Sequence, residues 1–150
     1  MLVRTLLESR RTAAVRTMES GRRLAEAVAL MGGEKVSLIL VTRDAVPVGA
    51  LSRGDLLSAL ADGPMPAAMD RSVEEVMTPG LISVGPDDRI DRAVEVALNA
   101  DLRWVPVIEE GRILGILSAH ELFQWRLDGL RDEVGHLQTY IADLQEAAFD

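Results

Sequence analysis

The sequence contains no cysteine, and this absence excludes several kinds of chemistry together. Without thiols the chain can form no disulfide, no thiol nucleophile and no cysteine-ligated metal site, and it fits a reducing compartment. Aromatic residues are also scarce, at 3% of the 150 residues, so the hydrophobic core must be aliphatic. The 48% of hydrophobic residues is enough to bury such a core.

The sequence also lacks an excess of positive charge and a long apolar run. The formal net charge of −8 argues against nucleic acid as a partner, because a phosphate-backbone binder needs a basic surface. No uncharged apolar run approaches the ~18–20 residues of a membrane span. Charged residues such as Arg4 and Glu8 interrupt the N-terminal segment before a signal-peptide core could form. We therefore expect a cytoplasmic protein that binds neither membranes nor nucleic acid.

One eight-residue segment, residues 115–122, has a close copy at residues 49–56. The offset of 66 residues continues without a gap from the pair Arg23 and Arg89 to the pair Leu56 and Leu122. Such a gapless alignment is hard to obtain by chance, so the chain is a tandem repeat.

In each copy an apolar run ends in a serine, and an acidic residue follows three positions later: Ser52 with Asp55, and Ser118 with Glu121. A strand that feeds a helix start leaves unpaired backbone N–H groups that favour an anion. The hydroxyl can bond a phosphate or sugar oxygen, while the carboxylate can accept from ribose hydroxyls. The same spacing is also that of a helix-capping box. The pattern thus fits either a nucleotide grip or a cap, and its repetition favours a shared ligand-binding frame.

The hydrophobic periodicity predicts strand, helix, strand, strand and helix, in that order, twice over. We therefore expect an α/β (α+β) fold. The expected elements of the first repeat are strand 13–16, helix 22–31, strands 37–42 and 46–51, and a helix from residue 53. Those of the second are strand 81–84, helix 89–99, strands 104–109 and 112–117, and a helix from residue 119. Short helical segments at residues 2–7 and 73–77 introduce the repeats, Gly32-Gly33 should end the helix 22–31, and residues 86–88 should cap the helix 89–99.

These elements divide the chain into a first repeat at residues 1–62, a linker at 63–72, a second repeat at 73–127 and a C-terminal helix at 128–150. The linker is predicted from its glycine and prolines. In the C-terminal helix, apolar residues recur at alternating steps of three and four, which is typical of a coiled-coil seam. This seam runs through Leu127, Leu130, Val134, Leu137, Ile141 and Leu144. It can fold back on its own domain or pair two chains.

Several short segments of the second repeat resemble one known family. They are Met77-Thr78-Pro79, Ile82-Ser83-Val84, residues 103–107 and Gly115-Ile116-Leu117-Ser118. With the repeat itself, they make residues 2–128 similar to a tandem pair of CBS domains, the modules named after cystathionine beta-synthase, of the stand-alone bacterial type. The resemblance implies two β-α-β-β-α repeats about a pseudo-twofold axis, clefts that accept adenosine-containing ligands, and a homodimer.

The resemblance also implies roles for individual residues. In the first cleft Ser52 would take the hydroxyl position, Asp55 would be the acid that binds ribose, and Arg53 would meet phosphate. In the second cleft Ser118 takes the hydroxyl role, and Glu121 stands where the family usually has Asp. His120 and Arg103 are further phosphate contacts, each of which is otherwise a solvated surface residue. The residues implied around adenine, which are core residues by default, are Val15, Thr17, Ile82 and Val105.

The leading hypothesis is a regulatory module that senses AMP, ADP or ATP, has no covalent cofactor, and acts on an unknown regulated protein. The alternative is a ligand-free dimeric scaffold that displays the C-terminal helix. An enzyme is not expected, because His120 and His136 have no nucleophile motif around them. A metal site is not expected either, since the acidic residues of 87–91 cluster at a helix start, where acids serve as caps.

Overall fold

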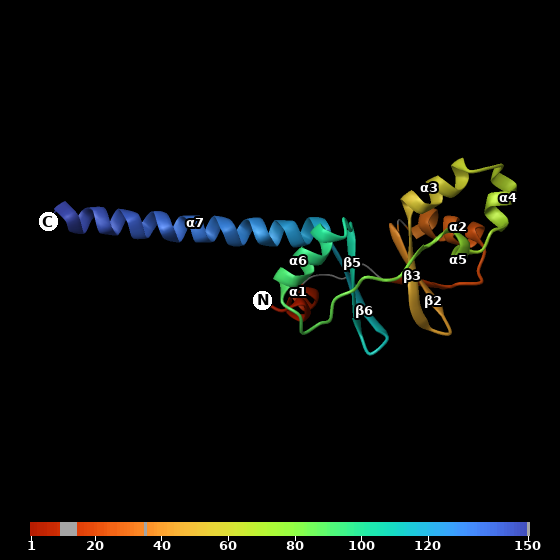
Figure 1. The fold of residues 1–150 in the computed structure, drawn as a ribbon, viewed down its shortest axis with the longest axis horizontal. Coiled ribbons are helices and arrows are strands. Elements are labelled where there is room, and N and C mark those ends of the chain that lie inside the picture. Colours follow the sequence, from red (N-terminus) through yellow and green to blue (C-terminus); the bar gives the residue numbers. More distant parts are fainter. Residues whose placement is uncertain (10–14, 35, 150) are drawn as a thin grey trace.

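The computed structural model describes residues 1–9, 15–34 and 36–149, which form two lobes and one long helix (Figure 1). Lobe 1 contains four strands and four helices, and lobe 2 contains a β-hairpin, two helices and the first turns of the long helix. The elements of lobe 1 are β1 (Arg16–Glu19), α2 (Leu24–Glu34), β2 (Leu38–Arg43), β3 (Val46–Ser52), α3 (Arg53–Ala61), α4 (Met65–Asp70), α5 (Val73–Val76) and β4 (Thr78–Pro79). Those of lobe 2 are α1 (Val3–Ser9), α6 (Ile90–Asn99), β5 (Trp104–Glu109), β6 (Arg112–Ser118) and α7 (Ala119–Phe149).

The sheet of lobe 1 has the strand order β1-β2-β3-β4. Strand β1 runs parallel to β2, and the other neighbours are antiparallel. Because side chains alternate along a strand, Ile39, Val41 and Leu51 point into the core beneath the helices. Leu38 and Leu40 point to the opposite face, yet they are 8% and 0% exposed and belong to neither core cluster. That face is covered from the side of lobe 2, where β6 lies against β3 (Figure 1).

Lobe 2 repeats the central hairpin with the same register. Its strands β5 and β6 pair antiparallel, with a bulge between Val107 and Ile108 where lobe 1 has one between Val41 and Thr42. The strand that corresponds to β1 is reduced to one parallel bridge from Val84 to Val107. The repeated sequence therefore fixes the hairpins, whereas the sheet edges differ.

The two introductory helices exchange lobes. Helix α1, at the start of the first repeat, packs on lobe 2, where Val3 is fully buried and its N–H donates to the carbonyl of Asp88 (2.9 Å). Helix α5, at the start of the second repeat, packs on lobe 1, where the N–H of Val73 donates to the carbonyl of Arg22 (2.8 Å). Consecutive repeats in the sequence are therefore interleaved in space, and each lobe needs a segment from the other repeat.

The central strands and the helix starts predicted from the sequence agree with the structure. The hairpin strands lie within one residue of their expected bounds, and α3 and α7 begin at Arg53 and Ala119. The α+β architecture with a long C-terminal helix is confirmed as well.

Other expectations about elements are wrong. Helix α2 continues through Gly32-Gly33 to Glu34, because glycine weakens a helix but keeps the backbone N–H and so does not remove its hydrogen bonds. Asp88 does not cap α6; its carboxylate accepts from the N–H of Gly85 (2.8 Å) and closes the preceding turn. The expected strand 81–84 is the single bridge at Val84, and of the expected strand 13–16, residues 13 and 14 lie outside the described residues. The segment predicted as a linker, which remains a prediction, includes the short helix α4, whose proline stands in the first turn, where a helix tolerates it.

Helix α7 leaves lobe 2 and extends away from both lobes (Figure 1). Its first turns cover the core of lobe 2, where Leu122 is fully buried and Phe123 is partly buried. The guanidinium of Arg126 then donates to the carboxylate of Asp91 on α6 (3.2 Å), which fixes the base of the helix. Within the described ranges, no helix combines the length and the apolar content that a membrane crossing needs.

Candidate functional site

The first repeated motif forms a polar cluster where strand β3 runs into helix α3. Ser52 is the N-cap of α3, and its hydroxyl oxygen accepts from the N–H of Asp55 (3.2 Å). One carboxylate oxygen of Asp55 accepts from both the N–H (2.8 Å) and the hydroxyl (3.0 Å) of Ser52. The other oxygen accepts from the hydroxyl of Thr78 on β4 (3.1 Å). The capping box is thus formed, and it brings together residues from both sequence repeats.

A glycine of the repeated motif explains how β4 reaches this cluster. A Cβ atom added to Gly49 would lie 2.7 Å from the carbonyl oxygen of Thr78 and 2.6 Å from the sulfur of Met77. Both distances are shorter than real Cβ contacts. Glycine at this position therefore allows β4 to pair with β3 and places the Thr78 hydroxyl beside Asp55.

The second repeated motif forms a similar cap at the start of α7. The hydroxyl oxygen of Ser118 accepts from the N–H of Glu121 (3.0 Å), and the Glu121 carboxylate accepts from the N–H of Ser118 (3.1 Å). The backbone of Arg103 lies beside this cap, and its carbonyl accepts from the N–H of Ala119 (2.8 Å). The side chain of Arg103 is exposed. The residue one repeat before Thr78 is Thr12, which lies outside the described residues.

The other predicted contact residues lie in several environments. Arg53 and His120 are exposed in the first turns of α3 and α7, next to the two caps. Ile82 is 49% exposed in the segment that connects β4 with lobe 2. Val105 is fully buried in the core of lobe 2. Val15 is partly buried just before β1.

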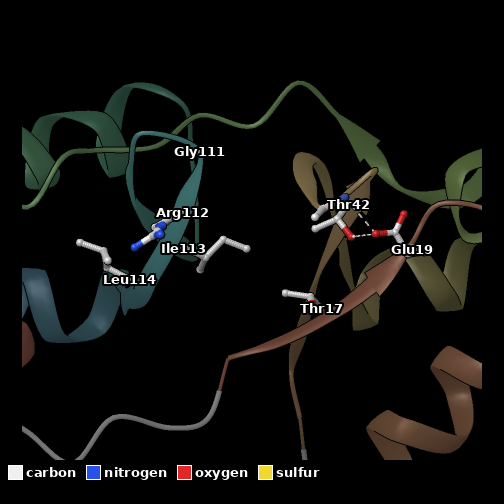
Figure 2. A pocket seen from close by; sticks show the side chains of 8 residues that line it. Thr17, Glu19, Thr42, Gly111, Arg112, Ile113 and Leu114 are labelled. Atoms are coloured by element: carbon white, nitrogen blue, oxygen red, sulfur yellow. Dashed lines mark hydrogen bonds between the residues drawn. The ribbon is translucent and has the colours of Figure 1, made fainter.

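A pocket of about 440 Å³ lies between the lobes, near the turns of the two hairpins (Figure 2). This volume is within the range of small-molecule sites. Its walls come from both lobes: Thr17, Glu19, Thr42 and Ala45 on one side, and Gly111, Arg112, Ile113 and Leu114 on the other.

Glu19 provides a carboxylate on one wall of this pocket. Its carboxylate accepts from the hydroxyl of Thr42 (2.9 Å) and from the N–H of Ala45 (3.1 Å), the first of which is drawn in Figure 2. The Thr42 hydrogen bond, followed by that of Ala45, lowers the pKa of Glu19 below its ordinary value of 4.5. The side chain is therefore an anion at neutral pH, with the cationic Arg112 on the opposite wall.

The pocket and the first cap are separate features. Thr42, at the pocket, and Leu38, which pairs with Ser52, are four residues apart on β2, or about 13 Å. Of the residues predicted from the sequence, Thr17 lines the pocket, while Ser52 and Asp55 do not.

Thr78, Glu19 and Arg112 were not among the site residues predicted from the sequence. Thr78 carried a signal, because it lies in a segment that resembles the CBS family, but its contact with Asp55 depends on the pairing of β3 with β4. Glu19 and Arg112 belong to no repeated motif. They face one pocket only because the lobes pack together.

Comparisons with known proteins agree with this architecture. The family model of the CBS domain matches residues 73–128. The crystal structure of a CBS-domain-containing protein from Agrobacterium tumefaciens is 28% identical, with a TM-score of 0.72, over 84% of this chain and 99% of that one. The structure of CBSX2 in complex with AMP is 21% identical, with a TM-score of 0.67, over 85% of this chain and 96% of that one.

The similarity to curated proteins covers parts of longer chains. A homoserine O-acetyltransferase from Methanohalobium evestigatum is 26% identical over 110 residues, which are 72% of this chain and 21% of the relative. The chain spans about a fifth to about half of the length of the first curated relatives that it matches.

The similarity to the Agrobacterium protein covers both lobes, and the family model matches the second repeat, whose hairpin and helix start recur in the first. On this evidence, residues 73–128 match the CBS domain, and the chain has the fold of CBS-domain proteins of known structure.

Proposed function

We propose that this protein is a regulatory module that binds an adenosine-containing nucleotide between its two repeats. The observation that carries the proposal is the cluster of Ser52, Asp55 and Thr78. There a carboxylate and two hydroxyls from two chain segments meet at the N-terminus of a helix. Such a group can accept from paired ribose hydroxyls, while the helix N-terminus favours a phosphate.

The positive charges beside the two caps support a phosphate-bearing ligand. Arg53 stands in the first turn of α3, and Arg103 stands beside the Ser118 cap, both with exposed side chains. Arg53 thus lies at a helix start and the backbone of Arg103 lies beside one, in a chain of net charge −8. The complex of AMP with CBSX2, which shares the fold, gives a precedent for the ligand class.

As a sensor, the protein would have no catalytic role of its own. It would act in the cytoplasm on a separate regulated protein through the differential affinity of its ligand for two states. The homoserine O-acetyltransferase activity of a curated relative is not part of the proposal, since this chain spans 21% of that protein.

The ligand is tested by thermal unfolding against AMP, ADP, ATP, NADH and S-adenosylmethionine. A ligand that binds only the folded state stabilises it by RT ln(1 + [L]/Kd), so one compound should raise the Tm in a concentration-dependent way. We expect an adenosine phosphate to give the largest shift.

The site is tested with the variant Asp55→Ala. Its Kd for the nucleotide that raises the Tm is measured by isothermal titration calorimetry and compared with that of the parent chain. Loss of a charge-assisted hydrogen bond of about 1.5–3 kcal/mol should weaken binding roughly 10- to 150-fold. Glu75→Ala is the matched control, because Glu75 occupies the same position in the Ser72 cap of α5, outside the proposed site. An unchanged Kd in Asp55→Ala would refute the site assignment.

A ligand-free dimeric scaffold that displays α7 is the second candidate. The observation that favours it is that both carboxylate oxygens of Asp55 already accept hydrogen bonds within the chain, so the cluster is complete as a structural cap. Absence of a Tm shift with every compound at about a millimolar would favour the scaffold over the sensor.

A further inference from the structure

Helix α7 extends far beyond the domain that it caps. It has 31 residues and is about 46 Å long. Every described side chain from Leu127 to Ala148 is exposed, and Figure 1 shows this part of the helix extending away from the other described elements. The seam of the C-terminal helix therefore does not fold back on its own chain. Most of the stability of a helix in a protein comes from packing of its apolar face rather than from helix propensity, so this exposed segment favours a partner.

The exposed surface of α7 carries one continuous apolar seam. In heptad notation the a positions hold Leu127, Val134 and Ile141, and the d positions hold Leu130, Leu137 and Leu144. These six side chains are between 42% and 60% exposed. The glycines at 129 and 135 fall at the outer c and b positions, so the seam loses no side chain to them. The seam is complete over about three heptads.

The residue types on the seam favour one kind of partner. Leucine occupies every d position, and the β-branched Val134 and Ile141 occupy two of the three a positions. β-Branched residues at a with leucine at d favour a parallel two-stranded coiled coil over higher oligomers. A second α7 supplies the same sequence in the same register.

The charges on α7 permit two acidic chains to approach. Most carboxylates of the exposed helix lie at the outer b, c and f positions: Asp128, Asp132, Asp143 and Glu146. Of the flanking e and g positions from Arg126 to Gln145, only that of Glu133 is acidic. Two helices that meet along the seam therefore keep most of their negative charge apart, although each chain carries a net −8.

The one like-charge contact of the parallel arrangement is already compensated. Arg126 at g would face Arg131 of the second copy at e. Within the chain, Arg126 pairs with Asp91 (3.2 Å) and Arg131 pairs with Asp128 (3.9 Å). Each of the two arginines is thus already paired with a carboxylate of its own chain.

We propose that α7 pairs with α7 of a second copy as a parallel two-stranded coiled coil along the seam from Leu127 to Leu144, so that both pairs of lobes lie at one end of the dimer. This interface is independent of the nucleotide site, which lies on the lobes.

The pairing is tested by light scattering coupled to size exclusion of the whole chain. The parent chain and His136→Lys, which adds a charge at the outer c position, should both be dimeric at about 50 µM, a concentration above the Kd of a micromolar dimer. Leu137→Lys, which puts the charge on the neighbouring d position, should be monomeric with an unchanged thermal transition of the lobes. A monomeric parent chain, or a Leu137→Lys variant that remains dimeric, would overturn the proposal.

The orientation is tested with single cysteines, since the natural chain has none. In a parallel coil each seam residue faces its own copy, so Leu144→Cys alone should give a disulfide-linked dimer under mild oxidation. An antiparallel coil would instead cross-link only when Leu127→Cys and Leu144→Cys are mixed, and that result would refute the parallel arrangement. A Thr139→Cys control at the outer f position should remain uncross-linked.

Discussion

Lobe 1 and lobe 2 start from the same repeated sequence, yet they complete their sheets differently. In lobe 1 the strand β1 pairs with β2 over four residues and ends at Glu19. In lobe 2 the corresponding strand is the single bridge at Val84, which is followed by Gly85 and Pro86. Proline has no N–H for a further ladder bond, so the edge cannot continue. The repeated motif therefore determines the hairpin and the helix start, while residues outside the motif determine the edges of the two sheets.

The lobes also differ in polarity at the end of this edge strand. Glu19 has a carboxylate that is held by Thr42 and lines the interlobe pocket, whereas Gly85 occupies the corresponding position of lobe 2. The caps differ in sequence as well, because the first has Asp55 where the second has Glu121, and Ser37 stands where the second repeat has Arg103. Two ligand sites on this frame would therefore be inequivalent.

The largest expected effects come from the equivalent core leucines Leu51 and Leu117, both fully buried. Replacement of either by alanine should lower the free energy of unfolding by about 2–5 kcal/mol, measured in urea. Since the helices α1 and α5 exchange lobes, each variant should still unfold in a single transition.

The exposed leucines Leu57 and Leu98, at 68% and 62%, provide one control in each lobe and should change stability by less than about 0.5 kcal/mol when replaced by alanine. Two separate transitions in either core variant would show that the lobes unfold independently. That result would contradict the single transition expected from the exchange of α1 and α5.

A smaller effect is expected at the hairpin turns, where both lobes use positive φ. The first turn places Asp44 and Ala45 at φ 51° and 66°, and the second places Glu110 and Gly111 at 49° and 77°. Alanine is strained there and glycine is not, so Ala45→Gly should stabilise the protein by about 1 kcal/mol. Gly111→Ala should destabilise it by a similar amount. Thermal unfolding of both variants tests whether the two turns are equivalent. Changes in Tm of the same sign in the two variants would contradict that equivalence.

The smallest effect concerns the pH dependence contributed by Glu19. Its pKa in the folded chain lies below the ordinary 4.5, because Thr42 and Ala45 donate to the carboxylate. The stabilisation is therefore present above pH 4.5 and is lost as the pH falls through the folded-state pKa.

Glu19→Gln should accordingly flatten the fall in Tm on acidification below pH 4.5, measured by calorimetry. Glu110→Gln, an exposed residue at the turn of lobe 2, is the control. An equal acid dependence in Glu19→Gln and the parent chain would show that the hydrogen bonds do not favour the ionised form.

Much of the local structure could be predicted from the sequence. The apolar run from Leu38 to Val41, the turn residues and the serine followed by an acid each specify local geometry, so the hairpin strands and the starts of α3 and α7 were correctly placed. Helix ends were less predictable, as Gly32-Gly33 and Asp88 show, because capping depends on which hydrogen bonds neighbouring segments offer.

The sequence by itself determined the repeat, the hairpin registers, the two caps and the seam of α7. These follow from the periods of strand and helix and from residues that are close in the chain. Only the tertiary structure decided that α1 and α5 exchange lobes, that Thr78 reaches Asp55, and that Glu19 and Arg112 line one pocket. The physical reason is that these contacts join segments far apart in the chain, whose meeting depends on how two complete lobes pack.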